Sequence, residues 1–256
     1  MRETVFLSGI SQTVSILIRD YVLTLGFFMV ILAGTYAFQR NLKNKPDSSK
    51  RLLLSIIAVL VLTLEATRQA VAIVRGYTAD NLPLYICSLF LPIIALTAFS
   101  KKDSKHNRVG HALLHAIGLP VAASIVLVPF VVFDLQEYGS ATQRIFTTGA
   151  VFRHYHSFFF HMLSLFFVSL SVVLRPYKLQ NGDMFIACFS FLAFVLLSTL
   201  TSRVLGVDYT KIWALSCYVP LPLLIILYQL LPLSGCLLSL WLQSFIKRDD
   251  YRCCKQ

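Results

Sequence analysis

A cysteine and two histidines supply the chemistry that this sequence suggests. Cys87 lies in the apolar stretch NLPLYICSLF, residues 81–90. His156 and His161 are the first and last residues of HSFFFH, which lies in another apolar stretch. A cysteine thiolate is a nucleophile, and a neighbouring imidazole can take the thiol proton. These residue types predict acyl transfer through a thioester. The alternative for a lone cysteine is packing as a small apolar side chain.

A charged pair interrupts the apolar stretch that precedes Cys87. Glu65 and Arg68 are three residues apart in LEATRQ, which places both side chains on one face of a helix. Ionisable groups inside a membrane span cost roughly 2.5–3.5 kcal/mol each on insertion scales, so each needs a partner or a function. Arg68 can stabilise a thiolate or an oxyanion, and Glu65 can orient an imidazole or Arg68. The alternative is an internal ion pair that locks two helices together.

The composition indicates which elements position these side chains. Of the 256 residues, 57% are hydrophobic and 14% are charged, with a mean hydropathy of +0.71. Soluble domains are less apolar and more highly charged. We therefore predict an all-α, polytopic transmembrane bundle, a single integral membrane domain over residues 1–256, with no cleavable signal peptide. About seven spans are expected, with six as the alternative; they lie at 21–38, 52–74, 83–99, 110–133, 155–174, 184–204 and 212–232, and a basic cytoplasmic tail follows at 247–256.

The distribution of Lys and Arg predicts how the bundle is oriented. These residues concentrate in segments 39–51 and 100–109, just after the fifth span, and in the tail. Because positive residues mark cytoplasmic loops, we expect the N-terminus outside and the C-terminus in the cytoplasm. The net charge of +11 is interpreted as a topology signal, and no nucleic-acid partner is expected. At ~1.5 Å of rise per residue, Arg68, Cys87 and His161 then lie at a similar depth, in the outer half of the membrane.

Metal and disulfide chemistry is not indicated. The six cysteines show no CxxC or zinc-finger spacing, so we expect no disulfide framework, no metal site and no cofactor. His111 and His115 have the i, i+4 spacing of metal-binding helices. They lie at the cytoplasmic end of the fourth span, however, and are interpreted as interfacial or core histidines. Cys253 and Cys254, among basic residues of the tail, are candidates for palmitoylation.

Two segments carry a resemblance to a known family. LEATRQAVAIVRGYTADNLPLYICSL, residues 64–89, and HSFFFH, residues 156–161, resemble the YwaF-like, transmembrane protein 164 family of integral membrane proteins. The resemblance implies a membrane acyltransferase that moves a fatty acyl group onto a lysophospholipid through a cysteine thioester. It implies Cys87 as the acyl carrier and His161 as its general base, with His156 as the second choice. Its partners would be a phospholipid or lysophospholipid and a fatty-acyl donor.

One segment departs from that family. An asparagine-rich N…GTNY stretch between the last two spans is typical of the family, whereas the corresponding residues here read SRVLGVDYTKIW. Ser202 and Asp208 stand in place of amides, and Tyr209 is retained. We expect Asp208 and Tyr209 to contribute to substrate binding, and the departure implies an altered substrate or lost activity.

A second class of function uses the same residues. A non-enzymatic transporter or ligand-binding protein would form a pocket from Glu65, Arg68 and His161, with Arg68 meeting an anionic substrate. Kinks at Pro120 and Pro129 would suit moving helices. A receptor has little support, because the loops on both sides are short. The sequence leaves open the acyl donor, the oligomeric state and which membrane holds the protein.

Overall fold

The computed structural model describes residues 2–102, 104–127, 148–180, 182–209 and 216–253. Over this part of the chain the protein is all-helical and has no strand, which confirms the predicted fold class. The helices follow from long apolar runs with few glycines and prolines, in which every backbone group finds its hydrogen bond inside the helix.

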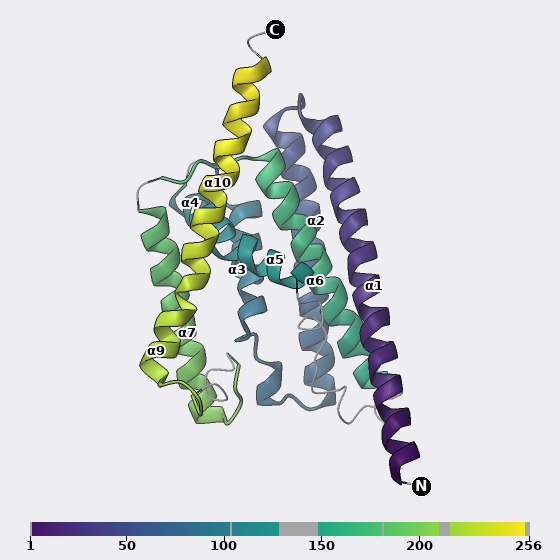
Figure 1. Ribbon diagram of the computed structural model, residues 1–256. Coiled ribbons are helices and arrows are strands. Elements are labelled where there is room, and N and C mark those ends of the chain that lie inside the picture. The colour runs from purple at the N-terminus through teal and green to yellow at the C-terminus, as the bar shows by residue number, and fades with distance from the viewer. Residues whose placement is uncertain (1, 103, 128–147, 181, 210–215, 254–256) are drawn as a thin grey trace.

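The helices form two groups with further helices between them (Figure 1). The first group is α1 (Arg2–Leu42), α2 (Asp47–Arg75) and α6 (Thr148–Leu174). The second group is α7 (Asp183–Leu205), α9 (Leu221–Tyr228) and α10 (Leu230–Cys253). Between the groups lie α3 (Phe90–Phe99), α4 (Lys105–Leu113), the π-helical turn η3 (Leu114–Gly118) and α5 (Leu119–Leu127).

Six helical segments of the described residues are long and apolar enough to cross a membrane. They are Tyr21–Leu42, Asp47–Arg75, Lys105–Ile125, Tyr155–Leu174, Asp183–Leu205 and Leu221–Trp241. Together with the family assignment given below, they establish an integral multi-pass membrane protein. The span expected at 83–99 corresponds to a shorter apolar helix, Ile86–Phe99. Two expected spans lie partly outside the described residues. The parts outside are the end of the span expected at 110–133 and the start of the span expected at 212–232.

The shorter helix follows an irregular connection. Gly76, with φ of 92°, ends α2 in a conformation that suits glycine, and the chain then turns through η1 (Ala79–Asn81). An extended stretch leads from there to η2 (Ile86–Leu89), which continues into α3. In Figure 1 this connection rises from the lower end of α2 back into the bundle. The connection and α3 together take the chain from the lower end of the bundle to its upper end.

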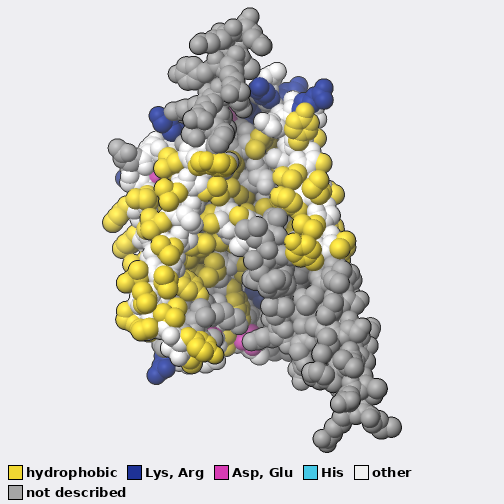
Figure 2. Space-filling model, viewed as in Figure 1, with side chains coloured by type: hydrophobic (Ala, Val, Ile, Leu, Met, Phe, Trp, Pro, Cys, Tyr) yellow, Lys and Arg dark blue, Asp and Glu magenta, His cyan; other side chains and the backbone are white. Residues whose placement is uncertain are grey.

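The surface separates apolar from basic side chains along the bundle axis. Figure 2 shows hydrophobic side chains over the middle of the molecule and most Lys and Arg side chains at its upper end. Large apolar residues such as Met29, Val74 and Phe185 are more than half exposed, as expected for contact with lipid. Orientation with respect to the cytoplasm stays a prediction, and the upper end would be the cytoplasmic one.

Small residues allow the helices to approach closely. Lipid chains are as apolar as the helix surfaces, so helix association in membranes depends on close packing, and glycine at a crossing permits it. The Cβ of any residue larger than glycine at position 235 would collide with the backbone carbonyl of Ala116 in η3. A Cβ added at Gly110 would also lie too close to the backbone, at 2.8 Å from Thr97 N and 2.9 Å from the carbonyl carbon of Leu96. Helix α10 therefore packs directly on η3, and α4 on α3.

This packing predicts that Gly235→Ala destabilises the protein. The added methyl group would force α10 away from Ala116, with an expected cost of about 1–3 kcal/mol. The matched control is Gly26→Ala on α1, because no heavy atom lies within 4 Å of the Cβ added there. Thermal unfolding in detergent, followed by size-exclusion chromatography, measures both. Equal unfolding temperatures for the two variants would contradict the close crossing of α10 and η3.

Candidate functional site

The centre of the site is an ion pair on the last turns of α2. Arg68 Nε donates to Glu65 Oε2 at 2.9 Å, and Arg68 Nη2 donates to Glu65 Oε1 at 2.6 Å. The two side chains are only 21% and 12% exposed. A bidentate pair of this kind is strong and fixes both side chains in direction as well as distance. The i, i+3 spacing read from the sequence therefore produces the predicted pair within one helix.

The same side chains hold the connection that follows α2. The backbone carbonyl of Asn81 accepts hydrogen bonds from Arg68 Nη2 at 3.1 Å and from Gln69 Nε2 at 3.0 Å. Gln69 Nε2 also donates to Glu65 Oε1 at 2.8 Å, and Tyr77 Oη donates to Gln69 Oε1 at 3.0 Å. The end of α2 thus fastens the loop that leads to Cys87. Gln69 and Tyr77 were not singled out from the sequence, because their contacts depend on the path of this loop.

His156 reaches the ion pair from α6. Its Nε2 atom lies 3.6 Å from Glu65 Oε2, just beyond hydrogen-bond distance, and is buried with no hydrogen-bond partner among the described residues. The ring lies between Phe152 and Phe160, with centroid distances of 6.1 and 6.0 Å. A buried imidazole nitrogen without a partner is costly unless a substrate or a proton transfer uses it. The position beside a carboxylate is typical of a histidine that takes up protons.

Cys87 lies in η2, at the end of the fastened connection. Its side chain is half-buried and reduced, and it interacts electrostatically with both Glu65 and Arg68. It also packs against the hydrophobic core of the bundle. The Glu65–Arg68 pair therefore interacts electrostatically with Cys87 and lies next to His156. We call these four residues, which come from α2, η2 and α6, the thiol cluster.

His161 has a different environment. It is 8% exposed, and its Nδ1 atom lies 2.7 Å from the backbone carbonyl of Ser157 on the same helix. An Nδ1–H that donates to a carbonyl leaves Nε2 as the proton-accepting nitrogen. His161 interacts electrostatically with His156 and meets Phe160 edge-on at 5.5 Å. Among the contacts of the described residues, His156 is connected directly to Glu65, and His161 is one step further away.

Helix α7 and the residues after it hold the connection from the other side. Tyr209 is 2% exposed, and its hydroxyl donates to the backbone carbonyl of Ala79 at 2.6 Å. Its backbone N–H donates to Ser202 Oγ at 3.2 Å, and its ring meets Tyr85 edge-on at 5.4 Å. Ser198 Oγ donates to the carbonyl of Leu84 at 3.1 Å. Tyr209 thus contacts the loop backbone, and its expected contribution to substrate binding stays a prediction.

Asp208, which was predicted beside Tyr209 as a substrate-binding residue, is half-buried. It interacts electrostatically with Tyr228 at the end of α9. This contact links the segment after α7 to the break between α9 and α10. Asp208 therefore lies on the α9 side of the site, whereas the thiol cluster lies on the side of α2 and α6.

A second polar cluster lies at the opposite end of the bundle. His111 stacks on Tyr177 with a centroid distance of 4.9 Å, and Tyr177 Oη donates to Asp183 Oδ2 at 2.9 Å. Arg108 Nε donates to Asp183 Oδ1 at 2.8 Å, and His115 Nδ1 lies 2.7 Å from a serine hydroxyl of α10. Burial and the Asp183 carboxylate raise the pKa of Tyr177 to about 12, so its hydroxyl stays a donor. These contacts fasten the connection between α6 and α7 to α4.

Among the residues that the structure describes, no three His, Cys, Asp or Glu side chains come together in a group that could hold a metal ion. The thiol cluster instead combines a nucleophile, an imidazole, a carboxylate and a guanidinium, which are the groups that acyl transfer requires.

Comparison with known proteins places the sequence in one family. The sequence model of the TMEM164 family matches residues 9–242, which is most of the chain. The match agrees with the resemblance seen at residues 64–89 and 156–161. No curated protein and no solved structure matches the chain.

The contacts of Tyr209 predict that its hydroxyl stabilises the connection before Cys87. Burial raises the pKa of Tyr209, so the hydroxyl stays protonated and donates at neutral pH. Tyr209→Phe removes this bond, with an expected cost of about 0.5–1.5 kcal/mol. Hydrogen exchange at the amides of Ala79–Leu82 should become faster. Tyr218→Phe is the control, because Tyr218 is 87% exposed. Unchanged exchange in Tyr209→Phe would show that α7 does not hold this loop.

Proposed function

We propose that this chain, which belongs to the TMEM164 family, moves a fatty acyl group onto a lysophospholipid through a thioester on Cys87. The observation that supports the proposal most directly is the thiol cluster itself. Cys87 and His156 come from different segments of a membrane-embedded bundle. His156 lies 3.6 Å from Glu65, and Cys87 interacts electrostatically with both Glu65 and Arg68. A site within the bilayer also suits substrates that partition into it.

The first half of the reaction loads the acyl group. His156 accepts the proton of the Cys87 thiol, and the thiolate attacks the carbonyl carbon of a fatty-acyl ester or thioester. The tetrahedral intermediate collapses as the bond to the donor's oxygen or sulfur breaks. The departing alcohol or thiol takes its proton from the His156 imidazolium, and the acyl group remains on the Cys87 sulfur.

The second half transfers the acyl group to the acceptor. The hydroxyl oxygen of a lysophospholipid attacks the thioester carbonyl while its proton passes to the imidazole. The carbon–sulfur bond breaks, and the Cys87 thiolate takes the proton back from the imidazolium. The cycle consumes one donor and one acceptor and restores the free thiol.

The ion pair supplies the electrostatics for both halves. Glu65 Oε2, at 3.6 Å from His156 Nε2, stabilises the imidazolium that forms each time the proton moves. Arg68 interacts electrostatically with the thiol, and it stabilises the thiolate and the oxyanion. Its Nε and Nη2 donate to Glu65 and Asn81, while Nη1 has no hydrogen-bond partner among the described residues. Nη1 is therefore the donor that can turn to the oxyanion.

Two histidines compete for the role of the base. His156 is favoured because it lies beside Glu65, whereas the hydrogen bond of His161 to Ser157 ties its ring to its own helix. His161 is the second candidate, since that hydrogen bond leaves its Nε2 as an acceptor. A non-enzymatic binding protein is the competing function. It would use the same Arg68 Nη1 to meet an anionic substrate, and it gives the neighbouring thiol of Cys87 no chemical role.

The proposal predicts that acyl transfer requires the Cys87 sulfur. Purified protein in vesicles, given a labelled acyl donor and a lysophospholipid, should lose transfer by about 100-fold or more in Cys87→Ser, because a serine hydroxyl is far harder to deprotonate. Cys188→Ser is the matched control, since Cys188 is also a half-buried free cysteine in the bundle. Transfer by Cys87→Ser at the wild-type rate would rule out the thioester.

The two histidines give a second prediction. His156→Gln should lower transfer by about 100-fold, because general base catalysis is typically worth 10²–10⁴-fold. His161→Gln should have a smaller effect, because glutamine can still donate to the Ser157 carbonyl. The rate of thioester formation in a single turnover, measured against pH, separates the roles. A pH profile that His156→Gln leaves unchanged and His161→Gln abolishes would reverse the assignment.

A further inference from the structure

The apolar groove next to Cys87 carries an inference about the substrate. Ile86, Leu227, Tyr228, Leu230, Leu231 and Ser234 line a groove of about 430 Å³ between η2 and the junction of α9 with α10. This volume falls within the range of ligand pockets, roughly 300–1,000 Å³. We propose that the groove holds the hydrocarbon chain of the acyl group that Cys87 carries. The inference rests on the proposed function and names the part of the substrate that the groove recognises.

One wall of the groove belongs to the same turn as the thiol. Ile86, which lines it, directly precedes Cys87, and both residues belong to the turn η2. Ile86, Cys87, Tyr228 and Leu231 also pack against the same hydrophobic core. An acyl group on the Cys87 sulfur therefore begins one residue away from the wall of the groove.

The groove lies at the break between two helices. Helix α9 ends at Tyr228 and α10 begins at Leu230, with the backbone N–H of Gln229 still bonded to Ile226 and Leu227. Pro232 follows within the first turn of α10, where a missing N–H is tolerated. Leu227 on α9 and Leu231 on α10 line the groove on the two sides of this interruption, opposite Ile86 of η2.

The lining fits a hydrocarbon chain better than a polar ligand. Four of the lining side chains are aliphatic, and Tyr228 and Ser234 add one hydroxyl each. The groove lies within the candidate span Leu221–Trp241, where the surrounding medium is lipid. Leu227 and Leu230 are 42% and 56% exposed, so a chain can enter sideways from the bilayer.

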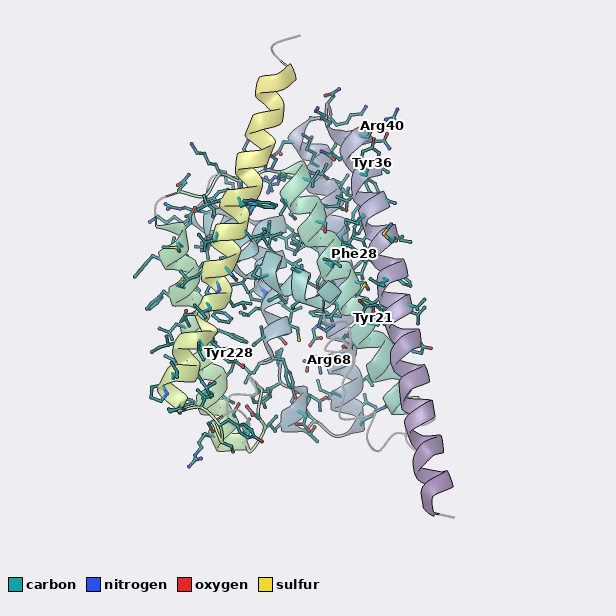
Figure 3. All side chains as sticks on the ribbon, viewed as in Figure 1. Tyr21, Phe28, Tyr36, Arg40, Arg68 and Tyr228 are labelled. Carbon is teal, nitrogen blue, oxygen red and sulfur yellow. The ribbon has the colours of Figure 1, made fainter. Side chains whose placement is uncertain are left out.

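Polar and apolar parts of the site lie at one level. Figure 3 shows Tyr228 and Arg68 at a similar height, on opposite sides of the lower half of the bundle. An acyl lipid has the matching division, with a polar carbonyl and head group at one end and a long apolar chain at the other. The thiol cluster would take the carbonyl, and the groove would take the chain.

The test is the chain-length preference of groove variants. Leu231→Trp should fill the groove and lower transfer of an oleoyl group about tenfold or more relative to an octanoyl group, since each lost methylene contact costs binding. Leu231→Ala should act in the opposite direction and favour bulkier chains. Leu237→Trp is the matched control, because Leu237 is also on α10 but is 68% exposed and lies outside the groove. Its chain-length profile should stay that of the wild type.

The outcomes separate the groove from the proposed function. If transfer depends on Cys87 but has the same chain-length profile in Leu231→Trp and Leu237→Trp, the proposal that the groove holds the acyl chain is wrong, and the proposed function stands. If the wild type transfers no acyl group, the proposed function fails, and a photoreactive oleoyl phospholipid in vesicles tests the groove directly. Crosslinks at Leu227–Ser234 that Leu231→Trp removes and Leu237→Trp keeps support a chain in the groove. Crosslinks that both variants keep, or no crosslinks at this segment, overturn it.

Discussion

The bidentate pair between Arg68 and Glu65 is the interaction on which the rest of the site depends. Charges within a membrane are costly unless they are paired, and removing one member of a buried pair typically costs about 3–5 kcal/mol. Here the two partners are one turn apart on α2, so the helix itself brings them together. The pair also contacts three neighbours. Glu65 accepts a hydrogen bond from Gln69 and lies next to His156, and Arg68 donates to the carbonyl of Asn81. One local interaction therefore organises a helix end, a loop and a second helix.

The loop between α2 and η2 explains how the Cys87 thiol can lie inside the bundle. Residues 76–85 leave α2 and return into the bundle, and their carbonyls need donors because no water reaches lipid-facing backbone. The side chains of Arg68 and Gln69 supply donors from α2, and Tyr209 and Ser198 supply them from the α7 side. This dual support replaces the hydrogen bonds of a regular helix. It leaves Cys87 in the turn η2, which precedes the short helix α3, instead of within a continuous span.

Part of this arrangement could be predicted from the sequence. Composition predicted the all-helical membrane bundle, and the i, i+3 spacing of Glu65 and Arg68 predicted their contact, because neither depends on how distant segments pack together. Loop contacts could not be predicted, since the hydroxyl of Tyr209 reaches Ala79 across 130 positions of the chain. The choice between the two histidines was also beyond the sequence. Five residues apart on a helix, they point in directions about 140° apart, and only the packing of α6 on α2 decides which one meets Glu65.

The central claim is that the Cys87 sulfur carries the acyl group during turnover. The most direct measurement is peptide mass spectrometry of protein that has been incubated with a fatty-acyl donor in the absence of acceptor. The account expects the mass of one acyl chain on the peptide that contains Cys87, removed by hydroxylamine and lost when lysophospholipid is added. Transfer of the acyl group to the lysophospholipid without any such adduct, even after rapid acid quenching, would contradict it.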